Sequence, residues 1–385
     1  MDIVFLGSVT DEERNSKLPG ASVAGNKMQL NIINHLSMMP NTTVSVISTP
    51  SIAAFPTYKK LVYMRKKYVL ENGCPIEEVP FINLPLIKQL MQIYFVYRTA
   101  CQYKRKSTVF VAFNLYPQVG NPLIKLKKHG SRTAAILADL PIDDNYSHKS
   151  HLIQIMNHMT EKNIASANHL IVLNKNAIEK YNPHADYIVM EGGCEDNNGT
   201  IEFNNPKEKN IVFCGRLIDY NGIIDLLEAM KYVKNQSICL DIYGSGPLEE
   251  KVKEYASEDT RIRFFGSVDN KTMMSIQKQA WLLINPRPVD DPISQVTFPS
   301  KMFEYLTSGT PVLTTKLSGF SEEYDSLMYY CVSDNAEGIG ESINKISQIP
   351  EEELRGKAKQ ARSYVLKHKN WKQQAEKMAS FLEDI

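Results

Sequence analysis

The chain has 385 residues, a formal net charge of +1 and ordinary hydrophobic and charged fractions, so about two globular domains are expected. No apolar run reaches the roughly 18 residues that a membrane-spanning helix needs, and Asp2 precedes a short apolar strand rather than a signal peptide. The six cysteines are scattered without a C-x-x-C pair, which predicts reduced core cysteines in a cytoplasmic protein.

The charge is unevenly distributed along the chain. Residues 1–200 carry a net charge of +5, whereas residues 201–385 carry −4. Between Val79 and Ala138 there is no acidic residue, but there are nine basic ones. These are Lys88, Arg98, Lys104, Arg105, Lys106, Lys125, Lys127, Lys128 and Arg132. An anionic partner is therefore expected for the first half, and nucleic acid is disfavoured because no recognition motif accompanies the charge.

The first half begins like a doubly wound α/β domain. A buried strand is predicted at Asp2–Gly7, followed by a long polar loop that ends at Asn26. A helix with a broad apolar face comes next, and then a second strand at 43–47.

Residues 59–106 mix basic and apolar side chains. The two kinds alternate over 59–67, and residues 84–103 predict a long apolar helix that ends in the basic run 104–106. One interpretation is a core helix with a solvated end. The other is peripheral attachment to an anionic membrane surface.

Acidic residues follow a predicted strand at 133–138. In open α/β sheets ligands bind beyond the carboxyl ends of the strands. Asp139, and to a lesser extent Asp143 and Asp144, are therefore candidates to face a ligand. The alternative for Asp139 is a role in capping the loop.

A second strand-and-helix series follows a polar, turn-rich linker at 196–209. Its first strand, at 210–214, leads into Gly215-Arg216, and a strand at 237–243 leads into Gly244-Ser-Gly-Pro. No G-x-G-x-x-G follows the first strand of the chain, which disfavours an NAD enzyme.

The stretch from Phe298 to Glu323 predicts a loop, a helix and a strand. Pro299 and Ser300 begin the helix, with Ser300 able to cap its free amides. The first turns carry Lys301 and Glu304. A helix N-terminus suits a phosphate, and a carboxylate one turn further can accept hydrogen bonds from a diol. Phosphate and diol together indicate a nucleotide sugar.

These motifs resemble those of the family 4 (group 1) glycosyltransferases. Glu304 matches the second Glu of the family's donor signature, and Gly309-Thr-Pro-Val follows it, but Val296 stands where the first Glu is expected. Gly215-Arg216 matches the family's phosphate-binding Gly-Arg, whereas Asn221 replaces its phosphate-binding Lys. The form of residues 285–304 resembles a subgroup of bacterial surface-polysaccharide enzymes.

The resemblance implies an α/β fold of two facing, Rossmann-like, doubly wound domains, the GT-B architecture. Residues 1–195 would bind the acceptor and residues 210–367 the nucleotide sugar. The segment 196–209 would be the linker, and a helix within 368–385 would cross back to the first domain.

The implied reaction is transfer of a sugar from a nucleotide-diphosphate donor, expected to be UDP-linked, with retention of anomeric configuration. The acceptor would be a hydroxyl of a glycan or a lipid-linked molecule in polysaccharide biosynthesis, in the cytoplasm or peripherally at the inner face of the membrane. No metal or other cofactor is expected, because no metal-ligand pattern occurs. An epimerase or phosphorylase of the same architecture would need motifs that are absent. A non-catalytic nucleotide-sugar-binding partner of another glycosyltransferase stays open, because of Val296 and Asn221.

The resemblance also implies the roles of the site residues. Asp139 and Glu304 are the expected catalytic residues, and Asp290 and Asp291 the expected contacts of the donor sugar. The expected donor-binding residues are Gly25, Arg216, Asn221, Tyr243, Gly244, Gly246, Phe265, Gly266, Ser300, Lys301 and Glu304. Lys301, with Arg287 as a further candidate, would compensate for the missing Lys.

Gly25 enters this set because the loop that ends at Asn26 resembles the family's N-terminal glycine loop. Gly20 is the other glycine of that loop that could approach the donor phosphates. The alternative is that the loop is a plain turn without a binding role.

Overall fold

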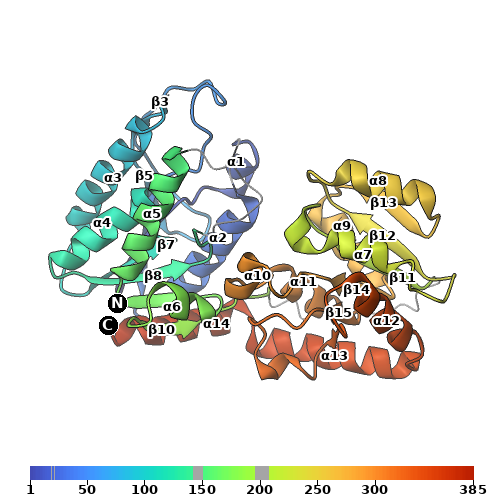
Figure 1. The fold of residues 1–385 in the computed structure, drawn as a ribbon. Helices are drawn as coiled ribbons and strands as arrows, with labels where there is room; N and C mark the ends of the chain where they lie inside the picture. The colour runs from blue at the N-terminus through green and yellow to red at the C-terminus, as the bar shows by residue number, and fades with distance from the viewer. Residues whose placement is uncertain (19, 21, 142–150, 196–207) are drawn as a thin grey trace. The chain divides into compact units, whose positions relative to one another are not determined.

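The computed structural model describes residues 1–18, 20, 22–141, 151–195 and 208–385 (Figure 1). Two compact units account for the chain: Met1–Gly192 together with Trp371–Ile385, and Gly193–Asn370. Asp143, Asp144 and residues 196–207 of the predicted linker lie outside the described residues.

An eight-stranded sheet forms the centre of the first unit as described. The strand order is β10-β9-β8-β7-β1-β2-β5-β4, and the pairs are parallel except for β4 against β5. The strands of this unit, including the small ribbon β3–β6, are β1 (Asp2–Gly7), β2 (Thr43–Ser48), β3 (Val62–Tyr63), β4 (Lys66–Val69), β5 (Pro75–Glu78), β6 (Phe81–Ile82), β7 (Thr108–Phe113), β8 (Arg132–Leu137), β9 (His169–Val172) and β10 (Asp186–Val189). Strand order reverses between β1 and β7, so the unit is doubly wound.

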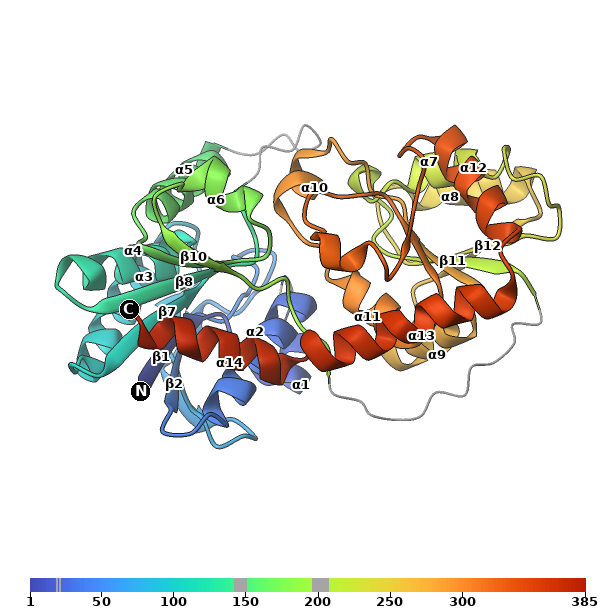
Figure 2. The same ribbon diagram turned by 90° about the horizontal axis from the view of Figure 1, so that it is seen from below.

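Helices cover both faces of the first sheet. The helices are α1 (Glu12–Ser16), α2 (Val23–Ser37), α3 (Ile87–Ala100), the 3₁₀ turn η1 (Cys101–Tyr103), α4 (Pro117–Lys128), α5 (His151–Ala165), α6 (Asn176–Tyr181) and α14 (Trp371–Glu383). Figure 2 shows α2 and α14 on one face, with α5 and α6 on the other. Phe5 of β1 and Ile33 of α2 share a buried cluster with Trp371 and Met378, so α14 completes the core of this unit.

A six-stranded parallel sheet forms the centre of the second unit. Its order is β13-β12-β11-β14-β15-β16, with the switch in strand order between β11 and β14. The strands are β11 (Asn210–Cys214), β12 (Cys239–Tyr243), β13 (Ile262–Gly266), β14 (Leu282–Asn285), β15 (Val312–Thr314) and β16 (Tyr329–Tyr330).

The helices of the second unit pack in two groups. In one group α7 packs against α12, and in the other α11 packs against α9 and α13. The helices are η2 (Asp219–Asn221), α7 (Ile223–Ala229), α8 (Glu249–Glu258), α9 (Asn270–Gln279), α10 (Pro292–Val296), α11 (Lys301–Ser308), η3 (Glu322–Tyr324), α12 (Ala336–Ser347) and α13 (Glu351–His368). Among the described residues, no helix combines the length and the hydropathy needed to cross a bilayer.

The loop predicted after the first strand differs from the structure. Asp11 accepts a hydrogen bond from the amide of Arg14 and caps α1, which is too short to show a periodic pattern in the sequence. Helix α2 then begins at Val23, within the predicted loop. All six cysteines are free, as predicted, but only Cys74 and Cys194 are buried, while Cys101 is exposed and the other three are half-buried.

Two glycines of the second unit allow a matched test of backbone packing. Gly222 and Gly266 both have positive φ, +72° and +69°. A Cβ at Gly222 would lie 1.8 Å from the Pro286 carbonyl oxygen, whereas one at Gly266 would meet nothing within 4 Å. We expect Gly266→Ala to lower the free energy of unfolding by about 1 kcal/mol through backbone strain. Gly222→Ala should cost at least ~2 kcal/mol more, measured by urea denaturation. Equal losses of unfolding free energy in the two variants would show that the backbone at Gly222 moves away from Pro286 easily.

Candidate functional site

The strongest candidate site lies at the carboxyl edge of the second sheet. The switch point is flanked there by the ends of β11 and β14, which pair in parallel. Ligands of doubly wound sheets bind outside such a point. Gly215-Arg216 follows β11, residues 286–291 follow β14, and α11 begins nearby in the same unit.

Helix α11 is fixed to the end of β11 by two side chains one turn apart. The amide of Cys214 donates to the Tyr305 hydroxyl at 3.1 Å, and the Lys301 ammonium donates to the Cys214 carbonyl at 2.7 Å. Tyr305 is buried, and this burial raises its pKa, so its hydroxyl stays protonated. The Lys301 ammonium also lies next to Gly215, the residue that follows β11. A Cβ built on Gly215 would lie 3.3 Å from Lys301 Nζ.

The first turn of α11 is open toward solvent. Ser300 occupies the N-cap position, but its side chain makes no capping hydrogen bond, contrary to the predicted cap. Glu304 is exposed, and its carboxylate has no hydrogen-bond or ion-pair partner in the described part of the chain. Its negative charge still reaches the thiol of Cys214, whose pKa is raised chiefly by burial and further by Glu304. Glu304 and Lys301 therefore lie at the same strand end.

Asn221 connects the loop after β11 to the loop after β14. Its Nδ2 donates to the Arg216 carbonyl at 2.8 Å, and its Oδ1 accepts from Arg287 Nε at 3.1 Å. The Arg287 guanidinium also lies over the Tyr220 ring, with Cζ 5.6 Å from the ring centroid. A cation from the second loop is thus held beside the position where the sequence lacks its expected Lys.

The loop that carries Arg287 is itself held in place. Thr315 Oγ1 donates to the Arg287 carbonyl at 2.5 Å, and the Val289 amide donates to Asp334 at 2.8 Å. Burial lowers the pKa of the Arg287 guanidinium, and the nearby Tyr220 and Asp291 oppose that shift. The guanidinium, with its low solvation, is thus a favourable partner for an anion.

Close backbone contacts within the protein require glycine, which has no Cβ, at positions 244 and 246. A Cβ on Gly244 would lie 1.8 Å from the Gly215 carbonyl oxygen, and one on Gly246 would lie 2.3 Å from the Leu217 oxygen. Gly244 also has a φ of +142°. The loop after β12 therefore lies directly against the loop that carries Arg216.

An aromatic pair lies at the ends of β12 and β13. The rings of Tyr243 and Phe265 stack with centroids 4.9 Å apart and an interplanar angle of 9°. Tyr243 is buried, but Phe265 is 50% exposed and precedes Gly266, whose carbonyl accepts from the Gly244 amide at 2.9 Å. This stack offers a flat apolar surface at the edge of the sheet.

The two predicted sugar contacts differ in their surroundings. Asp291 is buried and caps α10, since its Oδ1 accepts from the Ile293 amide at 2.8 Å. Asp290 is exposed. Val296, at the end of the same short helix, is buried.

In the first unit, Asp139 is held at the carboxyl edge by Asn114. Asn114 follows β7 with a φ of +58°, donates to Asp139 Oδ2 at 3.1 Å and accepts from the Asp139 amide at 2.9 Å. The side chain of Asp139 reaches solvent, yet the surrounding protein desolvates its carboxyl and raises its pKa, while the hydrogen bond from Asn114 opposes the rise.

Gly25 lies in the first turn of α2 rather than in a loop. Its amide donates to the Ser22 hydroxyl at 3.0 Å, and its carbonyl accepts from Gln29 at 3.1 Å. Both of its backbone groups are therefore engaged within the protein.

Asn114, Tyr305 and Tyr220 are site residues that the sequence analysis missed. Tyr305 had a signal, because it lies four residues after Lys301 and hence on the same face of the helix. Asn114 directly follows a strand, which places it at the carboxyl edge.

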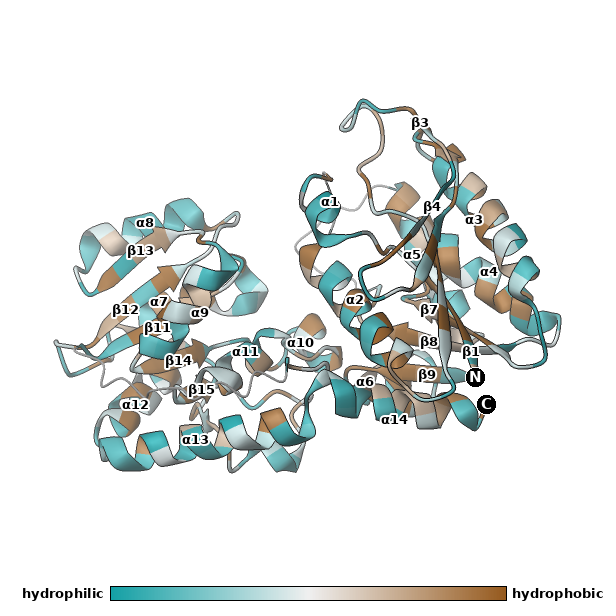
Figure 3. Cartoon of the chain, turned by 180° about the vertical axis from the view of Figure 1, so that it is seen from behind, coloured by the Kyte–Doolittle hydropathy of each residue, from teal (hydrophilic) through white to brown (hydrophobic). Residues whose placement is uncertain are grey.

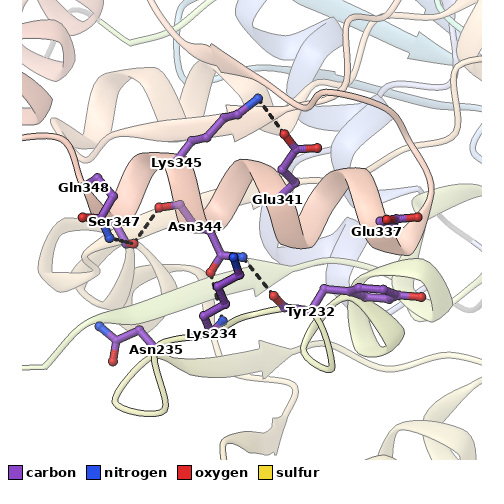
Figure 4. A pocket seen from close by; sticks show the side chains of 9 residues that line it. All are labelled: Tyr232, Lys234, Asn235, Glu337, Glu341, Asn344, Lys345, Ser347 and Gln348. Carbon is purple, nitrogen blue, oxygen red and sulfur yellow. Dashed lines mark hydrogen bonds and ion pairs between the residues drawn. The ribbon is translucent and has the colours of Figure 1, made fainter.

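An open groove of the second unit lies away from this site. Figure 4 shows this groove, of about 810 Å³, between α12 and the loop before β12, toward the amino ends of the strands. Its side chains are mostly engaged with one another, as in the 2.8 Å pair of Lys345 with Glu341. Within the described ranges, no group of three or more His, Cys, Asp or Glu side chains could hold a metal ion.

Residues 208–348 match the family model described as glycosyl transferases group 1. This stretch lies within the second unit and contains the site at β11 and α11. No curated protein matches the chain.

Solved structures match the whole chain. Sucrose-phosphate synthase from Thermosynechococcus elongatus matches with a TM-score of 0.74 and 14% identity, covering 100% of this chain and 99% of that one. The Anabaena protein HepE in complex with UDP matches with a TM-score of 0.68 and 13% identity, covering 100% of both chains. The catalytic domain of Arabidopsis thaliana starch synthase IV, bound to ADP and acarbose, matches at 0.67 and 11%, covering 99% and 98%. The chain therefore has the α/β fold of the GT-B glycosyltransferases, as predicted.

The cations at the switch point predict binding of a diphosphate. We expect pyrophosphate to bind the protein and raise its melting temperature, more strongly at low than at high salt. Arg287→Ala should weaken this binding at least roughly tenfold, as expected for a lost charge-assisted hydrogen bond. The control Lys345→Ala removes a cation of the distant groove and should leave the affinity unchanged. Calorimetric titration measures both, and equal affinity of the Arg287 variant and the wild type would contradict this assignment.

Proposed function

We propose that the protein is a retaining glycosyltransferase that moves a sugar from a nucleotide-diphosphate donor to an acceptor hydroxyl. The observation that carries the proposal is the joint placement of Lys301, Arg287 and Glu304 at the switch point of a group 1 glycosyltransferase domain. Two cations suit the diphosphate, and an exposed carboxylate beside them suits the ribose diol.

UDP is the nucleotide that we propose first. The fold neighbour HepE was solved in complexes with UDP and with UDP-glucose, which supports a UDP-linked donor. The stack of Tyr243 and Phe265 would receive the base, and the backbone at Gly244, Gly246 and Gly266 would line its approach. Asp290 would contact the donor sugar, whereas Asp291 serves chiefly to hold α10.

Catalysis would rest on stabilising the leaving diphosphate. The nucleotide diphosphate gains negative charge as the bond to the sugar breaks, and Arg216, Arg287 and Lys301 would balance that charge. Lys301 and Arg287 are fixed before any ligand binds, so little reorganisation is needed. Because these cations supply the charge, we propose that no resident metal is needed and that chelators leave turnover unchanged.

Asp139 would align the acceptor. The hydrogen bond from Asn114 orients its carboxylate, and its raised pKa makes it a better proton acceptor than an ordinary aspartate. The proposed acceptor is a glycan or a lipid-linked molecule in polysaccharide biosynthesis.

Glu304 is tested by a comparison of ligands. We expect UDP at 100 times its dissociation constant to stabilise the protein by about 2.7 kcal/mol in a thermal-shift panel with GDP, ADP and CMP. Glu304→Ala should lose most of this shift, whereas Glu322→Ala, at an exposed carboxylate outside the site, should keep it. UDP that lacks a ribose hydroxyl should bind the wild type weakly, and it should bind the Glu304 variant as UDP does. If the variant still distinguishes the two ligands, Glu304 does not contact the ribose.

Asp139 is tested by turnover and by pH. Asp139→Asn should keep nucleotide binding and the melting temperature while lowering kcat at least roughly 100-fold, the lower end of the range for such groups. In the wild type, activity should fall on acidification at a pH above the ordinary aspartate range, because the folded pKa is raised. Asn114→Gly removes the hydrogen bond that favours the carboxylate, so the acidic limb should move to still higher pH.

The turnover assay also distinguishes an enzyme from the alternative function, a non-catalytic nucleotide-sugar-binding partner of another glycosyltransferase. Binding of the nucleotide sugar without transfer to any tested glycan or lipid-linked acceptor would favour a non-catalytic binding partner. A product with inverted anomeric configuration, seen by NMR, would contradict the retaining mechanism.

A further inference from the structure

Helix α3 buries several polar side chains and exposes several apolar ones. Its buried residues are Lys88, Gln92, Val96, Thr99 and Ala100. A stripe with helical spacing, formed by Ile87, Leu90 and Tyr94, is 43%, 66% and 57% exposed. Packing against the first sheet normally buries the apolar face of a helix and leaves the polar face in water. The stripe of Ile87, Leu90 and Tyr94 is therefore available for a contact outside the unit.

A strained turn presents another apolar side chain at the start of this helix. Leu86 has φ +67° and ψ −51°, and the Ile87 amide donates to the Pro85 carbonyl at 2.8 Å, which defines a γ-turn. A leucine rarely adopts this conformation, and here its side chain is 55% exposed. This turn therefore presents a leucine side chain to solvent.

The neighbouring β3–β6 ribbon continues this pattern. Val62 and Ile82 are direct cross-strand partners and are both exposed, while the next pair, Tyr63 and Phe81, stacks inward at 4.5 Å. The ribbon is joined to α3 by a contact from the Ile82 amide to the sulfur of Met91. Figure 3 shows hydrophobic residues on α3 and on β3 at the same end of the unit. The docking face consists of Leu61, Val62, Met64, Ile82, Leu86, Ile87, Leu90 and Tyr94.

Positive charge surrounds the docking face. Lys59, Lys60 and Lys66 are exposed beside its residues. The only acidic residues between 54 and 100 are Glu71, Glu77 and Glu78. Glu77 and Glu78 are buried, with Arg65 and Lys67 on Glu77 and Arg14 on Glu78. The charge that reaches solvent around this face is therefore mostly positive.

We propose that this face docks on the surface of a membrane rich in anionic lipid. Interleaved apolar and cationic side chains fit the boundary between lipid headgroups and acyl chains, where an aromatic such as Tyr94 is also favoured. A second copy of the chain fits less well, because an isologous contact would bring the lysines of both copies together. The docking face belongs to the first unit and shares no residue with the donor site of the second unit. Its lysines come from the mixed basic and apolar stretch at 59–67.

Vesicle co-sedimentation of the full chain tests the proposal. We expect binding to phosphatidylcholine vesicles that contain about one third phosphatidylglycerol, and at least tenfold weaker binding to phosphatidylcholine alone. Leu90→Ser and Met64→Ser should each weaken binding severalfold without lowering the melting temperature, because both side chains are already exposed. Met38→Ser, which removes an equally exposed side chain of the same unit at 68%, is the matched control and should bind as the wild type does.

Two further variants test the role of positive charge and the independence of membrane binding from the donor site. Lys59→Glu with Lys66→Glu should abolish the preference for anionic vesicles. Glu304→Ala, in the donor site, should bind vesicles normally, so that failure of the donor assignment and failure of this one are distinguishable. No binding of the wild type to anionic vesicles would overturn the proposal. So would unchanged binding of the Leu90 variant, or a dimer that Leu90→Ser dissociates, which would identify a second copy as the occupant.

Discussion

The backbone of Cys214, at the end of β11, is the point on which the site of the second unit depends. Both of its backbone groups form hydrogen bonds with side chains of α11. The amide donates to the Tyr305 hydroxyl, and the carbonyl accepts from the Lys301 ammonium. A buried backbone group without a partner costs on the order of 1–3 kcal/mol, so both contacts resist change. Since the two side chains lie one turn apart, they fix the depth and the rotation of the helix. That fixation sets where Glu304 and the open first turn of α11 lie.

The loops around this point pack backbone against backbone. Gly222 lies against Pro286, and Gly244 lies against Gly215, at distances that leave no space for a Cβ. Contacts of this kind allow little sliding, because each loop blocks the next. The cation-bearing loops after β11 and β14 are therefore held relative to each other before any anion arrives. Such preorganisation is what an electrostatic site needs, since moving charges into place during the reaction would cost free energy.

The sequence predicted those features of the site that depend on local pattern. Strand ends marked by glycine located Arg216, and a helix start located Lys301 and Glu304. It missed contacts between residues far apart in the chain, such as Asn221 with Arg287 across 66 positions. Local pattern places Asn114 at a strand end and Tyr305 on the helix face of Lys301, but it does not show that Asn114 holds Asp139 or that Tyr305 reaches β11. The sequence predicted a loop up to Asn26, whereas Ser22 caps α2 and places Gly25 in its first turn.

The coupling of Asn221 and Arg287 also explains how the site can lack the expected Lys. A Lys at 221 would bring an ammonium next to the Arg287 guanidinium and remove the acceptor of its Nε hydrogen bond. Like charges that close repel unless an anion lies between them. Asn221 instead accepts from the guanidinium, and Tyr220 supports its flat face. A guanidinium offers a planar fork that matches two phosphate oxygens at once, which an ammonium cannot do. In the proposed function, the positive charge is therefore kept while its source moves from the β11 loop to the β14 loop. Asn221 can then not be exchanged for the expected Lys without disturbing Arg287.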